Sequence, residues 1–188
     1  MDGENRQIIE GVIWKQLLIF FFPILLGTFF QQLYNTVDAI IVGRFLGKEA
    51  LAAVGGPSGY LVNLLLGFFI GLCSGATVVI AQFFGAGDAE RASRAVHTSM
   101  ALSIAAGAAM SLVGAFLAEP ALTAMDTPPE VLPHAVSYLR IYFGGILFMF
   151  VYNMGAAVLR AKGDSKRPFY LLVLATIVNI IMAHLGVI

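Results

Sequence analysis

Long apolar segments alternate along the chain with short polar stretches, and this alternation predicts a set of membrane-crossing helices. About twenty mostly apolar residues are enough for a helix to cross a bilayer. The segments that reach this length cover residues 13–42, 51–84, 96–117, 134–159 and 169–188. We therefore expect an all-α integral membrane fold, a bundle of five transmembrane helices over residues 13–188. The polar residues 1–12 are expected to form a cytoplasmic N-terminal segment.

The composition agrees with a membrane protein. Hydrophobic residues make up 59% of the 188 residues and charged residues 12%, whereas soluble domains are about half apolar and a quarter charged. The formal net charge is zero, so no nucleic-acid partner is expected. Cys73 is the only cysteine, which excludes a disulfide framework and a cysteine metal site. The polar, acidic start lacks the basic region of a cleaved signal peptide, so the first apolar segment is expected to remain.

The first apolar segment carries an unusual polar face. Gln31, Asn35 and Asp38 are spaced to share one side of a helix, and Tyr34 lies one turn before Asp38. An ionisable side chain inside a membrane helix typically marks an ion pathway or a ligand site. The structural alternative is that Asp38 lies at the water interface and ends the helix. Pro23 can kink this helix, which gives it either a fixed shape or a hinge that moves Asp38.

The second and third segments contain small residues suited to helix packing. Gly67, Gly71 and Gly75 repeat at four-residue spacing and are expected to form a groove against which another helix packs. The third segment is rich in alanine, serine and glycine and is predicted to lie inside the bundle. Between the two segments, Asp88 can cap the helix that follows it. Residues 119–133 carry acids and prolines and are predicted to form a loop.

Basic residues predict the orientation. Cytoplasmic loops of membrane proteins are enriched in lysine and arginine. The loops after the second and fourth segments contain Arg91, Arg94, Arg160, Lys162, Lys166 and Arg167, whereas those after the first and third contain only Arg44 and Lys48. The N-terminus is therefore expected in the cytoplasm and Asp38 in the outer half of the membrane. We expect a multi-pass protein of the cell (inner or plasma) membrane, with the lipid bilayer as a partner.

Four separated motifs resemble one transporter family. Pro23 precedes Asp38 by fifteen residues, and DAIIVGRFLGKEALAAVG follows from Asp38. The other three motifs are AQFFGAGD at 81–88, LRAKGDSKRP at 159–168 and VNII at 178–181. Together they resemble the first helix and the later loops and helix of the MATE (multidrug and toxic compound extrusion) transporters.

The resemblance implies a function and a site. MATE transporters have two six-helix lobes and export cationic or amphipathic compounds in exchange for protons or sodium. This chain then corresponds to most of the N-terminal lobe. Asp38 matches the acid central to cation coupling, Asn179 an asparagine near that acid, and Pro23 a proline proposed to bend. Gln31, Asn35 and Asn179 can supply oxygen ligands to sodium at Asp38, or they form interhelical hydrogen bonds. No cofactor is expected beyond the coupling proton or sodium, and the partners are a small-molecule substrate and a second lobe.

Two departures from the family pattern leave alternatives open. Where many members carry an acid four residues after the asparagine, this chain has Ala183, with His184 beside it. The chain also stops after the fifth segment, which predicts either a fragment that lacks its C-terminal lobe or a half-sized relative that pairs as a homodimer. The alternative functions are a lipid-linked precursor flippase of the same superfamily and a truncated fragment that does not transport. We do not expect an enzyme, since no accessible nucleophile with paired acids and no phosphate-binding loop is apparent.

Overall fold

The computed structural model describes residues 13–187, except for the side chains at positions 13, 16, 46, 183, 184, 186 and 187. The predicted segment 1–12 and the side chains of Ala183 and His184 therefore lie outside the described residues. Within the described range the chain is helical and contains no strand. The predicted all-α fold is confirmed.

Between residues 13 and 187, six α-helices and one π-helical turn follow one another. The first is α1 (Ile13–Ile41), which continues through the π-helical turn η1 (Val42–Leu46) into the short α2 (Gly47–Gly55). The longer helices that follow are α3 (Pro57–Gly85), α4 (Ala89–Ala124), α5 (Leu132–Ala161) and α6 (Lys166–Val187). Among the described residues, four stretches are long and apolar enough to cross a membrane: Leu17–Phe45, Gly47–Gly85, Ala89–Ala124 and Leu132–Ala161.

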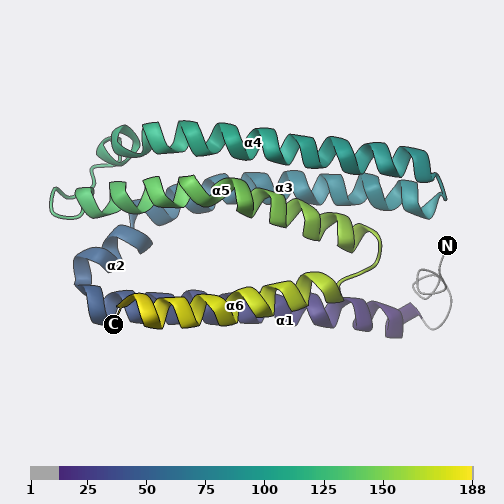
Figure 1. Ribbon diagram of the computed structural model, residues 1–188, viewed down its shortest axis with the longest axis horizontal. Helices are drawn as coiled ribbons and strands as arrows, with labels where there is room; N and C mark the ends of the chain where they lie inside the picture. Colours follow the sequence, from purple (N-terminus) through teal and green to yellow (C-terminus); the bar gives the residue numbers. More distant parts are fainter. Residues whose placement is uncertain (1–12, 188) are drawn as a thin grey trace.

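The helices form two groups (Figure 1). Helices α3, α4 and α5 pack into a three-helix layer, and α1 and α6 lie side by side below it. Helices α1 and α6 run in the same direction, and α2 connects the end of α1 to the layer. Helix α5 crosses obliquely between the groups, so that its last turns approach the start of α6. We call α1 and α6 the helix pair and the other three long helices the helix layer.

The hydrophobic core lies in the helix layer. The rings of Phe69 on α3 and Phe150 on α5 stack with their centroids 3.6 Å apart, and both side chains are buried. Helix α4 approaches α5 closely because it presents glycine there. A Cβ on Gly107 would lie 3.0 Å from the Cα of Leu147, and a Cβ on Gly114 would overlap the ring of Phe143. Helix α4 packs through this face only, because Leu102, Leu112 and Phe116 elsewhere on it are exposed; the predicted position of the third segment inside the bundle is therefore not seen in the described chain.

The helix pair has a smaller contact of its own. Gly27 of α1 is buried, and a Cβ at this position would lie 3.3 Å from Cδ2 of Leu172 on α6. Beside it, the ring centroids of Phe30 and Phe169 are 6.2 Å apart. The pair is joined to α5 through a hydrogen bond of 3.4 Å from the Tyr152 hydroxyl to the carbonyl oxygen of Pro168. One glycine therefore sets how closely α1 and α6 approach.

Some element boundaries differ from those expected. The second segment is broken at Gly56, whose φ and ψ of −82° and −132° are not helical. The cause is Pro57, which disfavours helical geometry in the residue before it and suits the first turn of a new helix. Helix α4 runs through Pro120 to Ala124, so the predicted loop at 119–133 is shorter. This extension is stabilised by bonds in its last turn, including one from the Thr123 hydroxyl to the Glu119 carbonyl oxygen.

Candidate functional site

Asp38 lies where the helix pair faces α5. It is half-buried, one turn before α1 changes into the π-helical turn. The side-chain amide of Asn179 on α6 lies near the Asp38 carboxylate. Tyr34 on α1 and Tyr138 on α5 are close enough for the charge of Asp38 to act on their hydroxyl groups. Three helices distant in sequence therefore bring polar groups to this acid.

Asn179 carries an unpaired polar atom at this site. Its Oδ1 is buried and has no hydrogen-bond partner within the described part of the chain. Leaving such a group unpaired costs free energy, so its presence calls for a ligand or a functional reason. An amide oxygen beside a carboxylate is a donor set for a hard cation such as sodium. In the described residues no three His, Cys, Asp or Glu side chains gather around a metal position.

A small cavity lies nearer the start of α1, beside the first turns of α6. Its volume is about 120 Å³, and α1, α5 and the first turns of α6 form its walls. Polar lining groups come from Gln31, Asn153 and Arg160, and Pro23 also lines it. The Asn153 side chain donates a 2.9 Å hydrogen bond to the carbonyl oxygen of Met149, one turn earlier on α5. The cavity combines amide groups with a cationic side chain.

The predicted polar face of α1 is therefore divided between two places. Asp38 lies near Asn179 of α6, and Tyr34 lies one turn before Asp38 on α1. Gln31 instead lines the cavity near Pro23. Asn35 is exposed on the surface of α1. Near Gln31 the cavity wall is completed by Asn153 and Arg160 of α5.

The predicted glycine groove of α3 is not covered by a helix of the described chain. Gly67, Gly71 and Gly75 are exposed, and a Cβ on any of them would meet no heavy atom within 4 Å. This corrects the expectation that another helix packs against the groove. The close approach uses Gly107 and Gly114 of α4 instead, because α4 turns that face toward α5.

Two features of the site were not assigned from the sequence. The charge of Asp38 acts on Tyr138 of α5, and Tyr142 lies one turn further along α5, with the two tyrosine ring centroids 5.9 Å apart. Their i,i+4 spacing inside an apolar segment is the signal that could have identified them. Arg160 had been considered only as a loop charge, but the last turn of α5 places it in the cavity wall.

The sequence was compared with known protein families and with individual proteins, and both comparisons match multidrug transporters. The MatE family model matches residues 23–185. The chain is 36% identical to the probable multidrug resistance protein YoeA of Bacillus subtilis over 170 residues. That alignment covers 89% of this chain and 36% of YoeA.

Solved structures show the same similarity. A MATE protein in its straight conformation superposes with a TM-score of 0.89 at 27% sequence identity, covering 97% of this chain and 40% of the other. For a MATE protein in a bent conformation the TM-score is 0.86 at 28% identity, with the same two coverages. The chain thus spans about two fifths of the length of the solved structures it matches.

Proposed function

The chain belongs to the MatE family, and on this premise we propose that it forms the N-terminal lobe of a cation-coupled multidrug exporter. The observation that carries the proposal is the half-buried Asp38 carboxylate beside the buried, unpaired oxygen of Asn179. The name of YoeA supports a multidrug cargo and favours export over the alternatives of lipid-linked flipping and an inactive fragment. The cargo proposed is a cationic or amphipathic compound, and the coupling ion is a proton or sodium. A role in transport rather than catalysis fits the family.

Coupling follows from the charge of one acid. Low dielectric disfavours a bare carboxylate, so either protonation or sodium binding stabilises Asp38 in the membrane. A cationic substrate, in contrast, interacts best with the unneutralised carboxylate. Ion and substrate therefore oppose one another, and by linkage each weakens the binding of the other to the same extent. An ion gradient across the membrane can then drive release of the substrate.

The cavity extends this site toward the other end of the pair. Its amide groups, from Gln31 and Asn153, can hydrogen-bond polar parts of a substrate, while its apolar walls accept the remainder. Pro23 lines this cavity, and a proline within a helix removes one backbone hydrogen bond. We propose that α1 bends at Pro23, which changes the cavity and the position of Asp38 together. Similarity to MATE structures in straight and bent conformations supports this hinge.

Replacement of Asp38 tests the coupling. Asp38→Asn keeps the size of the side chain but cannot ionise, so gradient-driven export by the complete protein that carries this chain should fall to background. Export of a fluorescent cation from vesicles, normalised to folded protein, is the measurement. Asp126→Asn is the matched control, since Asp126 is exposed and its positive φ of 51° is a conformation that asparagine also accepts. Export that persists in folded Asp38→Asn protein would refute the assignment.

The proposed orientation has its own test. The positive-inside bias places the α4–α5 loop outside and the α5–α6 loop in the cytoplasm. Reporter domains fused at Pro129 and at Ser165 should therefore report outside and inside, respectively. The reverse pattern would overturn the orientation and would leave the ion site unaffected.

We propose that a second lobe covers the exposed polar side of this chain. Asn63 is exposed on α3, and a polar group in contact with lipid is costly. Alternating access also requires one bundle to move against another around the site. A missing C-terminal lobe is preferred to a second copy of the chain, because matched relatives are more than twice as long. If the 188-residue chain alone reconstitutes gradient-driven export as a monomer, this proposal is wrong.

A further inference from the structure

A groove separates α3 from α4 at the end of the helix layer where the two helices are connected. It is open and has a volume of about 500 Å³. Small and apolar residues of α3 form one wall, including Gly75, Ala76 and Val79. Gly75 lies ten residues before the end of α3 at Gly85, which corresponds to about 15 Å of helix. The groove therefore extends from the helix ends well into the apolar part of the bundle.

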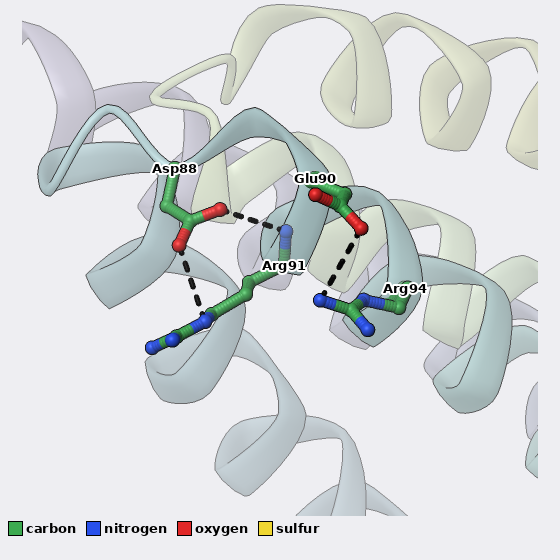
Figure 2. Close-up of polar contacts among 4 residues, drawn as sticks. All are labelled: Asp88, Glu90, Arg91 and Arg94. Carbon is green, nitrogen blue, oxygen red and sulfur yellow. Dashed lines mark hydrogen bonds and ion pairs between the residues drawn. The ribbon is translucent and has the colours of Figure 1, made fainter.

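Two arginines of α4 lie at the mouth of this groove. Arg91 and Arg94 line it together with Thr98, and their spacing places all three on one side of the helix. Figure 2 shows the two guanidinium groups on the same side of α4, each beside an acid. A basic mouth above an apolar slot matches the two parts of an anionic phospholipid.

The acids beside these arginines hold them only weakly. Nε of Arg91 is 3.3 Å from Oδ2 of Asp88, and Nη2 of Arg94 is 3.5 Å from Oε1 of Glu90. The arginine side chains are 65% and 69% exposed, and exposed pairs of this kind contribute little to stability. Each pair engages one guanidinium nitrogen, which leaves the other donors of the fork for a ligand. A phosphate can therefore bind both arginines without breaking a strong contact.

We propose that the groove between α3 and α4 binds an anionic phospholipid. Its phosphate lies at Arg91 and Arg94, and one acyl chain lies along the small residues of α3. Basic pockets between transmembrane helices bind such headgroups in the same way, and each basic residue near an anionic headgroup adds to the affinity. Arg91 and Arg94 each keep guanidinium donors that their acids do not engage, so a headgroup with two phosphates can be held by both arginines. Cardiolipin is therefore the probe.

Native mass spectrometry of the protein, expressed with its complete reading frame, tests this proposal. Cardiolipin should remain bound under conditions in which phosphatidylcholine does not. The double variant R91Q/R94Q should weaken cardiolipin binding by about thirtyfold, the loss expected for two basic residues at an anionic headgroup. The control K166Q/R167Q removes the same charge from the exposed start of α6 and should change binding less than about twofold.

A second variant tests the apolar part without touching the arginines. A Cβ on Gly75 would meet no atom of the chain within 4 Å, so Gly75→Leu adds bulk to the groove without a clash inside the chain. It should also weaken cardiolipin binding, whereas a charge-only contact would leave binding unchanged. Equal retention of both lipids, equal loss in all three variants, or displacement of cardiolipin by inorganic phosphate would each overturn the lipid site.

Discussion

The helix layer and the helix pair are both built from apolar helices, but they differ in how much of each helix is buried and in which polar residues they contain. In the most apolar stretch of each helix, 39% of the residues of α5 and 17% of those of α3 and α4 are buried inside the chain, whereas the share for α1 is 6%. The layer contains stacked rings and glycine contacts, while the pair contains Asp38, Asn179 and most of the cavity wall. Regions with few buried contacts open and move at low free-energy cost. The layer contains most of the buried packing, and the pair contains most of the residues of the candidate site.

The largest effect is expected from a cavity in the layer. Phe150→Ala removes a buried ring that stacks on Phe69 and should destabilise the protein by about 3–5 kcal/mol. Thermal unfolding in a mild detergent is the measurement. Phe148→Ala is the control on the same helix, because Phe148 is 76% exposed, and it should stay within about 0.5 kcal/mol of the parent. Equal losses in the two variants would contradict the assignment of the core.

A smaller effect is expected from one added methyl group in the layer. Gly114→Ala places a Cβ against the ring of Phe143 and should cost about 1–3 kcal/mol by overpacking. Gly71→Ala makes the same change on α3, where a Cβ meets open space, and should not destabilise the chain. The same unfolding measurement compares the two. A destabilising Gly71→Ala in the isolated chain would show that this face is packed after all.

The smallest effect on stability is expected for a substitution in the helix pair, which should instead lower the rate of export. Pro23→Ala supplies the missing backbone donor and straightens α1. We expect slower export per folded molecule, with the unfolding temperature of the layer unchanged. Pro120→Ala is the matched control, a proline inside α4 at the exposed end of the layer, and its export should match the parent. If Pro23→Ala changes stability alone, the proline shapes a static helix.

Local chemistry made the helix ends predictable. Asp88 accepts a 2.9 Å hydrogen bond from the backbone N–H of Arg91, which is the predicted cap of α4. The short basic turn before α6 contains Gly163, with a φ of 85°, and Asp164, which accepts bonds from the N–H groups of Lys166 and Arg167. In each case the residues that determine the structure are neighbours in sequence. Such signals do not depend on how the helices pack.

Tertiary partners were not predictable in the same way. The glycine spacing of α3 is well suited to helix packing, yet the close approach in the layer uses Gly107 and Gly114. Both helices offer small residues, and only the path of α5 decides which face is covered. For the same reason, only the family resemblance placed Asp38 beside Asn179. The spacing of Gln31, Asn35 and Asp38 did not predict that Gln31 lines the cavity and that Asn35 is exposed. The π-helical turn at Val42–Leu46 had no recognised signal.

The helix pair joins the first and the last helix of the described chain, which has a consequence for biosynthesis. Gly27 meets Leu172 only after nearly the whole chain has been made, which takes roughly ten to thirty seconds at ordinary translation rates. During that interval α1 satisfies its own backbone in the membrane, but Asp38 still lacks Asn179. The newly inserted first helix therefore holds Asp38 in the membrane without its α6 neighbour until α6 has been synthesised. The same late contact therefore completes both the proposed ion site at Asp38 and Asn179 and the packing of α1 against α6.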